Sequence, residues 1–354
     1  MDLSRRAIIV GAAVAGAVAA TSRGAQAALP PGVSDTPLPP FTNTKRVIVD
    51  TDPGNDDAVA LLMLMRSPSI SIEAITIAPG NVGYDDEVRN ALYIVDLAGQ
   101  SGRIPVHSGA KHALLDRPYP SASFIHGKSG LGTFTAPAVR QRPDPEHAAD
   151  AIRRIVKKYP GEVVIVALGA PTNVALALLR EPEIASLIKG IQFTGGPMLG
   201  AIPSFNSLAD PEATSILLTS GARLSMLGGT TYLVDSLLYK ADFEAISKLN
   251  TPFSRFFMQS NGLRLKYEVE QRNSPGSVNG DPLSAALIID PSVGLEHIAV
   301  SMKIELEGEL TRGTLLYGDN RYNGKATPVP NVNLWTRASN DRFRNLLIRS
   351  LGQS

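Results

Sequence analysis

Short apolar runs rich in β-branched residues alternate with amphipathic segments along most of the chain. The apolar runs fall at residues 47–49, 72–77, 163–167, 190–193 and 224–227. Segments with helical spacing of apolar residues lie between them, at 85–98, 147–158 and 173–179. Buried strands that alternate with helices are typical of a mostly parallel sheet covered on both faces. We therefore predict an α/β fold with one open sheet flanked by helices.

Polar or Gly-rich residues directly follow four of these apolar runs. Asp50 and Asp52 end the first run, and the other three are followed by residues 79–81, 168–170 and 194–196. Ligands of open α/β sheets bind outside the carboxyl ends of the strands, so we expect the functional site there. Residues 254–271 are expected to form a helix whose polar positions line a cavity.

The first 30 residues have the composition of an export signal. Arg5 and Arg6 precede an apolar run at 7–20, and small residues at 25–27 provide a cleavage site. We predict a bacterial twin-arginine signal that is cleaved after Ala27, and hence a periplasmic or secreted protein. A membrane anchor is the alternative, but the apolar run is shorter than the ~20 residues of a span. We expect no membrane association after cleavage. The Pro-rich residues 31–44 then predict an extended linker before a domain at 45–350.

Charge and cysteine content exclude several classes of function. Without its first 30 residues the chain has 31 basic and 32 acidic side chains, so its charge gives no reason to expect nucleic-acid binding. The chain has no cysteine. It therefore has no disulfide, no thiolate metal site and no cysteine nucleophile. The apolar fraction of 44% over 354 residues is enough for a large core.

Four aspartates lie within eight positions, at Asp50, Asp52, Asp56 and Asp57. Carboxylates this close together repel one another, and a bound cation would offset that repulsion. Ligands that are all oxygen favour a hard ion such as Ca²⁺ or Mg²⁺. The alternative is that these acids only cap a turn and occupy the first turn of a helix. Capping requires one or two acids, however, and four are present.

The octapeptide at 50–57, Asp-Thr-Asp-Pro-Gly-Asn-Asp-Asp, resembles the DxDPGxDD signature of the inosine-uridine-preferring nucleoside hydrolases. Further matches follow in the order of that family and cover nearly all of residues 45–350. They are Pro79-Gly80-Asn81, His126-Gly127, residues 169–173, Gly195-Gly196, Phe205-Asn206, residues 210–213, Asp281-Pro282 and Asp290-Pro291. The resemblance implies a nucleoside hydrolase fold and calcium-dependent hydrolysis of ribonucleosides to free base and ribose. It also implies a homodimer or homotetramer.

The resemblance implies a calcium site formed by three aspartates and one backbone carbonyl. Asp52 would bind calcium and also act as the base that takes a proton from a water molecule on the ion. Asp57 would bind through both oxygens, and Asp281 and the carbonyl of Leu168 would complete the protein ligands. Taken alone, Asp281 before Pro282 is a common cap or turn starter.

The resemblance also implies five contacts to the nucleoside. Asp56 and Asn81 match positions that hold ribose hydroxyls, and Asn206 matches an asparagine that contacts the sugar. His126 is expected in the base pocket, with satisfaction of backbone groups as the alternative role. Arg272 matches an arginine that some members use near the base, and a solvated cation at a helix end is its alternative role.

The chain differs from the family at positions that usually contact the nucleobase or the 5′-hydroxyl. The position before Asp281 holds His or Trp in many members, but here it is Gly280, which can neither donate a proton nor stack. The segment before Asn206 is also about four residues shorter than in the family, so the sequence does not predict the usual contact to the 5′-hydroxyl. We expect another group to assist the departing base, or a substrate whose leaving group needs little help. The candidate groups are His126, Arg272, Glu268 and Tyr267.

Two other functions are compatible with parts of this pattern. An exported nucleoside-binding protein would keep the calcium and ribose contacts without catalysis. A phosphatase of the haloacid-dehalogenase type begins with a similar Asp-Thr-Asp motif, in which the first aspartate, here Asp50, is the nucleophile. The Pro53-Gly54 turn argues against the phosphatase, because that fold favours Thr or Val at position 54.

Overall fold

The computed structural model describes residues 33–34, 41–115, 117–318 and 329–353. The predicted export signal and most of the predicted linker lie outside these residues. Of the linker, Val33 and Ser34 pair with a strand of the main sheet, and Phe41 and Thr44 are buried. Among the described residues, no helix has the length and apolar character needed to cross a membrane.

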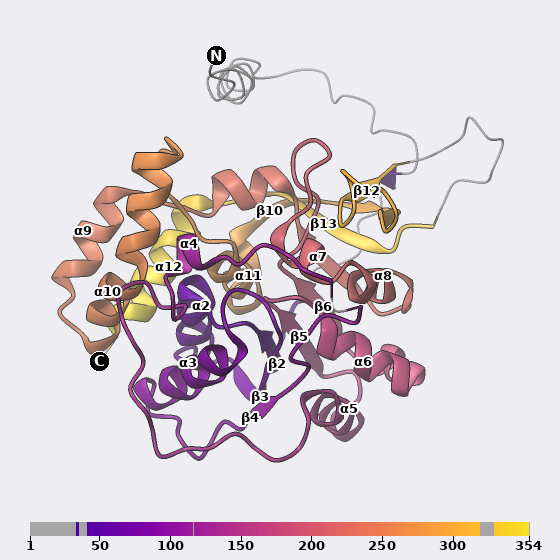
Figure 1. The fold of residues 1–354 in the computed structure, drawn as a ribbon, viewed down its shortest axis with the longest axis horizontal. Helices are drawn as coiled ribbons and strands as arrows, with labels where there is room; N and C mark the ends of the chain where they lie inside the picture. The colour runs from indigo at the N-terminus through magenta and orange to yellow at the C-terminus, as the bar shows by residue number, and fades with distance from the viewer. Residues whose placement is uncertain (1–32, 35–40, 116, 319–328, 354) are drawn as a thin grey trace. The chain divides into compact units, whose positions relative to one another are not determined.

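A nine-stranded sheet forms the centre of the fold, and most of its strands are parallel (Figure 1). In spatial order the strands are β1 (Val33–Ser34), β10 (Gly294–Val300), β13 (Val332–Ala338), β7 (Leu224–Leu227), β6 (Gly190–Phe193), β5 (Val163–Ala167), β2 (Arg46–Thr51), β3 (Ser71–Ile77) and β4 (Val106–Ser108). The pairs from β13 to β4 are parallel, whereas β1 and β10 add two antiparallel pairs at one edge. The predicted fold class is therefore confirmed.

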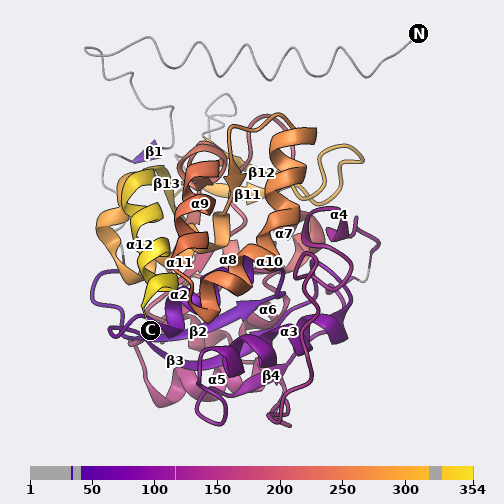
Figure 2. The ribbon, with the colours of Figure 1, turned by 90° about the vertical axis from the view of Figure 1, so that its left-hand side faces the viewer.

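Two groups of helices cover the two faces of the sheet. Successive residues of a strand point to opposite faces. In β2, Val47 and Val49 accordingly join one apolar core and Ile48 joins the other. The core of Val47 contains α2 (Asn55–Met65), α3 (Tyr84–Leu97), α9 (Lys240–Lys248), α10 (Pro252–Lys266), α11 (Gly280–Ile289) and α12 (Asn340–Gly352). The core of Ile48 contains α5 (Ala148–Lys158), α6 (Thr172–Arg180) and α8 (Pro211–Thr219). Figure 1 shows α5, α6 and α8 on one side of the strands, and Figure 2 shows α9, α10 and α12 packed together.

Short elements complete the described structure. They are the helices α4 (Ser123–His126) and α7 (Phe205–Ala209), the 3₁₀ helices η3 (Pro182–Ser186) and η6 (Pro291–Val293), and the π-helices η4 (Thr231–Asp235) and η5 (Tyr267–Gln271). Two antiparallel strand pairs lie outside the main sheet: β8 (Leu237–Leu238) with β9 (Ser277–Val278), and β11 (Met302–Ile304) with β12 (Leu315–Tyr317). The predicted helix at 254–271 is thus α10 followed by a π-helical turn.

Two helices begin at the carboxyl end of the sheet and are almost entirely buried. Asp56 and Asp57 lie in the first turn of α2, which follows β2 after the turn at Pro53-Gly54. Asp281 lies in the first turn of α11, which packs against α2 along its length. The amino end of a helix carries partial positive charge, so both helices favour carboxylates at this point.

Candidate active site

Asp57 is held by three hydrogen bonds at the start of α2. The Thr51 hydroxyl donates to its Oδ1 at 2.6 Å, and the Gly54 backbone N–H and the Asn81 amide donate to its Oδ2, each at 3.0 Å. Burial and the neighbouring charge of Asp56 nevertheless raise the pKa of Asp57 to about 6. The protein therefore fixes the position of this carboxylate without fully compensating its charge.

Asp52 lies between two glycines that leave room for its carboxylate. A Cβ atom added at Gly80 would lie 1.7 Å from Oδ2 of Asp52, and one added at Gly169 would lie 2.6 Å from Oδ1. The backbone N–H of Asn81 donates to Oδ2 at 3.0 Å. Burial, followed by the charge of Asp57, raises the pKa of Asp52 well above its ordinary value. The glycines of the two strand-end motifs are thus required by the close approach of Asp52.

Asp281 comes from α11 to complete the acid cluster. One carboxylate oxygen each from Asp56, Asp57 and Asp281 lie within 4.8 Å of one another, and all three residues are buried. Burial, followed by the charges of Asp56 and Asp57, raises the pKa of Asp281 well above its ordinary value. Oδ1 of Asp56 is buried and accepts no hydrogen bond from a described residue. The buried oxygens and the lack of nitrogen or sulfur ligands among them fit a hard divalent cation.

The triad of Asp56, Asp57 and Asp281 therefore contains only two of the four predicted metal ligands. Asp57 and Asp281 lie within it, and Asp52 lies beside Asp57, close enough for a hydrogen bond between the two side chains. The carbonyl of Leu168 accepts a hydrogen bond from the amide of Asn206. Asp56, which was predicted to contact the sugar, is the third member of the triad.

Asp50 belongs to the framework beneath the acid cluster. It is fully buried, and its Oδ1 accepts from the Thr76 hydroxyl at 2.6 Å and from the Asn173 amide at 2.9 Å. These bonds connect β2 to β3 and α6. Burial raises the pKa of Asp50 to about 7. Of the four clustered aspartates in the sequence, Asp50 is the one with a structural role, because its hydrogen bonds connect the strands and helix that carry the site.

Asp56 pairs with an arginine that sequence reasoning missed. Nη1 of Arg264 on α10 lies 2.5 Å from Oδ2 of Asp56, and both side chains are buried. Burial alone would raise the pKa of Asp56, but the charge of Arg264, together with that of His126 when it is protonated, outweighs burial and holds the pKa below its ordinary value. Nε of Arg264 lies 3.8 Å from Oε1 of Glu268, one helical turn further on.

Arg272 does not reach this cluster. It is exposed at the end of η5, and its side chain makes no hydrogen bond or ion pair to any residue in the described part of the chain. A sequence signal for Arg264 did exist, because the predicted cavity helix places Arg264 and Glu268 on one face at a spacing of four residues. Arg264, and not Arg272, is the arginine that contacts the acid cluster.

His126 lies beside Asp56 at the end of α4. Its Nδ1 is 2.8 Å from Oδ1 of Asn55 and 3.6 Å from Oδ1 of Asp56. Burial is the main cause that lowers the pKa of His126 to about 4, so the imidazole is neutral near pH 7. His126 is thus part of the site as a neutral ring that contacts the start of α2.

Both predicted asparagines lie at the acid cluster, and both donate hydrogen bonds from their side-chain amides to other groups of the protein. Asn81 donates to the Asp52 carbonyl and to Asp57, each at 3.0 Å. Asn206 donates to the Thr194 carbonyl at 2.6 Å and to the Leu168 carbonyl. Neither side-chain carbonyl accepts a hydrogen bond from the residues that the structure describes. These two oxygens can accept from a ligand.

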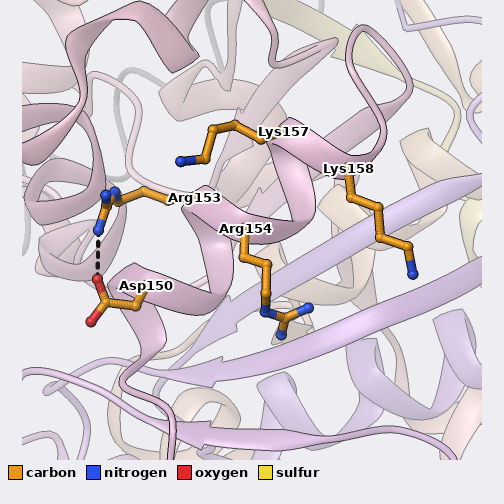
Figure 3. Close-up of a pocket in the computed structure, with 5 residues that line it drawn as sticks. All are labelled: Asp150, Arg153, Arg154, Lys157 and Lys158. Carbon is orange, nitrogen blue, oxygen red and sulfur yellow. Dashed lines mark hydrogen bonds and ion pairs between the residues drawn. The ribbon is translucent and has the colours of Figure 1, made fainter.

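Two other groups of charged residues differ from this site. Figure 3 shows a hollow on α5 lined by Asp150, Arg153, Arg154, Lys157 and Lys158. Arg153 pairs there with Asp150 and Glu181, and Arg154 pairs with Glu146. Nearby, His107 forms a possible cation group with Asp144 and Glu146, but Glu146 is already paired with Arg154. Most of these charged side chains are therefore already paired with an opposite charge on the protein surface.

Comparison with known proteins agrees with the fold and the site. The family model described as "Inosine-uridine preferring nucleoside hydrolase" matches residues 47–345. The chain therefore belongs to this family, and it is a hydrolase that acts on N-glycosyl compounds.

Relatives cover most of the chain. "Uridine nucleosidase 1" of Arabidopsis thaliana is 34% identical over 79% of this chain and 84% of its own length. The "Inosine-uridine preferring nucleoside hydrolase" of Crithidia fasciculata is 32% identical over 76% of this chain and 86% of its own length. The solved structure of the plant nucleoside hydrolase PpNRh1 matches with a TM-score of 0.81 and 27% identity, covering 88% of this chain and 99% of that one.

Proposed function

We propose that the protein hydrolyses ribonucleosides to free base and ribose at a calcium-dependent site, with Asp52 as the base that activates water. The observation that carries this proposal is the group of buried carboxylates at the carboxyl ends of β2, β3 and β5. Cleavage of an N-glycosidic bond passes through a ribosyl cation. The reaction needs negative charge near the sugar, a water on one face and assistance to the departing base.

Asp52, Asp57, Asp281 and the Leu168 carbonyl are the proposed ligands of Ca²⁺. When bound, the ion offsets the charge of the carboxylates and polarises a water molecule and sugar hydroxyls. The raised pKa values of Asp52, Asp57 and Asp281 support this assignment, because they reveal carboxylates that the protein alone does not neutralise. In the proposed complex the Asn206 amide keeps its bond to Thr194, and the second lone pair of the Leu168 carbonyl is available to the ion.

Asp52 is proposed as the base because its carboxylate is fixed in position at the strand end. The Asn81 N–H holds Oδ2, while Oδ1 lies against Gly169. A carboxylate held in this way accepts a proton from water without first reorienting. A general base of this kind contributes about 10²- to 10⁴-fold to a rate.

The sugar is proposed to bind between Asp56 and the two asparagines. Oδ1 of Asp56 is free to accept a hydrogen bond from a ribose hydroxyl, since its other oxygen is held by Arg264. The side-chain carbonyls of Asn81 and Asn206 supply two further acceptors. Because Arg264 keeps Asp56 ionised, this acceptor stays available over a wide range of pH.

The phosphatase alternative is disfavoured by the environment of Asp50. A nucleophile must reach its substrate, but Asp50 is fully buried and held by Thr76 and Asn173. Membership of a family of hydrolases disfavours the non-catalytic binding protein, and an assay of turnover tests it directly.

The decisive experiment measures release of reducing sugar from a panel of purine and pyrimidine ribonucleosides, with and without a calcium chelator. Ribose release that stops on chelation and returns with added Ca²⁺ supports the proposal. Binding without ribose release identifies the binding protein, and phosphate release from a phosphoester identifies the phosphatase. Metal analysis that finds zinc in the active protein contradicts the calcium site.

We further propose twin-arginine export to the periplasm or the exterior, with cleavage after Ala27, and assembly as a homodimer or homotetramer. The paired Arg5 and Arg6 support the export route. Mass spectrometry of the amino terminus from a periplasmic fraction tests the cleavage. Light scattering of the purified protein tests the assembly, and a monomer contradicts it.

A further inference from the structure

Gly280, the first residue of α11, is in contact with an aromatic ring. A Cβ atom added at Gly280 would lie 2.0 Å from Cε2 and 2.5 Å from Cδ2 of Tyr232. Gly280 does not have a positive φ, so its backbone does not itself require glycine. The ring of Tyr232 therefore occupies the volume that a side chain next to Asp281 would otherwise fill.

The position of Tyr232 is set by several backbone contacts. Its N–H donates to the Gly228 carbonyl at 2.8 Å, and its carbonyl accepts from the Ser236 hydroxyl. The Asn279 N–H donates to the same Ser236 hydroxyl at 3.0 Å. The π-helical turn η4 is thereby connected to the residue that precedes Gly280. The ring and the start of α11 are held together as one unit.

The hydroxyl of Tyr232 has no hydrogen-bond partner among the described residues. The side chain is partly exposed, and the charges acting on its hydroxyl are those of Arg264, Asp56, Asp281 and Glu268. Tyrosine is protonated near neutral pH even at its ordinary pKa of ~10. Burial raises the pKa of Tyr232 further. Tyr232 thus presents an uncommitted O–H donor beside the acid cluster.

We propose that Tyr232 forms the base side of the active site, with its ring against the nucleobase and its hydroxyl donating a hydrogen bond to the departing base. This inference rests on the proposed nucleoside hydrolysis. Negative charge accumulates on the base as the N-glycosidic bond breaks, and a fixed donor stabilises that charge. The ring also supplies a flat apolar surface for the base.

The contact has a consequence for position 280. A histidine placed there cannot reach the base while Tyr232 remains, because its Cβ alone would overlap the ring. Gly280→His is therefore not expected to improve turnover unless Tyr232 is also shortened. In this protein the ring of Tyr232 takes the place of a side chain at position 280 that would contact the base.

The test compares Tyr232→Phe with the unmodified protein on two kinds of substrate. Inosine and uridine need assistance to the leaving base, whereas p-nitrophenyl riboside releases a stable anion without it. We expect Tyr232→Phe to lower kcat on the nucleosides about 10²- to 10³-fold, as for loss of one fixed donor to a developing negative charge. The kcat on p-nitrophenyl riboside should change by less than about 3-fold. Tyr232→Ala, which also removes the ring, should raise KM for nucleosides in addition.

Tyr159→Phe is the matched control, because Tyr159 follows α5 and precedes β5, at the opposite end of the parallel strands. Equal fractional losses of kcat on nucleosides and p-nitrophenyl riboside would leave the ratio of the two values unchanged and would indicate a structural role for the hydroxyl. That outcome, or no loss on either substrate, would overturn the inference while leaving nucleoside hydrolysis intact. If the unmodified protein releases ribose from neither kind of substrate, the proposed function fails and this inference fails with it.

Discussion

Removal of the proposed calcium ion should destabilise the protein by an amount that depends on pH. Chelation leaves Asp52, Asp57 and Asp281 buried close together, where hydrogen-bond donors and, for Asp281, the charge of Arg264 offset their charge only in part. All three pKa values are raised in the metal-free fold. Between the unfolded and folded pKa values the folded state therefore binds more protons than the unfolded state. The free energy of unfolding of the metal-free protein must fall as pH rises through that window.

The size of this effect follows from Asp57, whose pKa rises from 3.8 to about 6. One pKa unit corresponds to about 1.4 kcal/mol, so ionised Asp57 destabilises the metal-free fold by about 3 kcal/mol above pH 6. For a domain of this length, about 3 kcal/mol corresponds to about 5 °C in Tm. Asp50 and Glu87 titrate in the same direction, with pKa values of about 7 and about 8. Asp50 is not a proposed ligand and its shift comes from burial, so its contribution should be similar with and without the ion, whereas the charge of Asp57 adds to the shift of Glu87.

The assay is thermal unfolding with excess chelator and with excess Ca²⁺, at about pH 5 and about pH 8. Calcium binds only deprotonated carboxylates and only the folded site, so it should raise Tm at both pH values and more at the higher one. An increment that is equal at both pH values, or larger near pH 5, would refute the linkage between these carboxylates and the ion.

Asp57→Asn provides the matched variant. The amide can keep the bonds to Gly54 and Thr51, since the Thr51 hydroxyl can rotate to accept. Near pH 8 the chelated variant should therefore be more stable than the chelated unmodified protein, by at most about 3 kcal/mol. It should gain less from calcium. A chelated variant that melts at a lower temperature than the unmodified protein would show that the hydrogen bonds of Asp57 outweigh its uncompensated charge.

Three further substitutions test separate parts of the site. Asp52→Asn should lower kcat by at least ~10²-fold without lowering the Tm of the chelated protein, and a wild-type rate on the best nucleoside would exclude Asp52 as the base. Arg264→Met should lower the free energy of unfolding in urea by about 3 to 5 kcal/mol, because Asp56 is left as a buried unpaired charge. The double variant Asp56→Asn/Arg264→Met should recover most of that loss, and an additive loss would contradict the ion-pair explanation. Gly280→Ala should cost about 1 to 3 kcal/mol through overlap with the Tyr232 ring. That cost should shrink in a Tyr232→Ala background, and the same cost in both backgrounds would show that the ring is not what limits position 280.

The sequence pattern predicted the centre of the fold more completely than its edges. The five predicted runs correspond to β2, β3, β5, β6 and β7, which are mostly buried parallel strands of largely apolar sequence. The pattern did not predict β4, β10 and β13. β10 is an edge-side strand with exposed and half-buried positions, and β13 contains Asn333 and Arg337, so neither has the continuous apolar run of a central parallel strand. The insertion of β13 between β10 and β7 also depends on pairings between distant segments, which local periodicity does not encode.

The acid cluster was predictable from local sequence, but the choice of arginine was not. Asp52, Asp56 and Asp57 lie within one strand–turn–helix unit, so their proximity follows from the chain itself. Arg264 and Arg272 are eight residues apart and would lie near one face of a regular α-helix. The helix changes to π geometry at Tyr267 and ends at Gln271, so Arg272 caps the turn and is exposed. A local change in helical geometry thus separates two arginines that the sequence alone does not distinguish.

The electrostatics assign different roles to two adjacent aspartates. Asp56 and Asp57 are consecutive, equally buried and both within the triad, yet the pKa of Asp56 is lowered and that of Asp57 is raised. The difference comes from Arg264, which lies on a helix distant in sequence and pairs with Asp56 but not with Asp57. Asp56 therefore has no need of a cation and is suited to accept a hydrogen bond from the sugar. Asp52, Asp57 and Asp281 hold three negative charges, and a divalent ion would leave one of them unbalanced. In the proposed mechanism Asp52 would lose that remaining charge on taking a proton from water, while the water oxygen bonds to the sugar and the electron pair of the broken N-glycosidic bond leaves with the base.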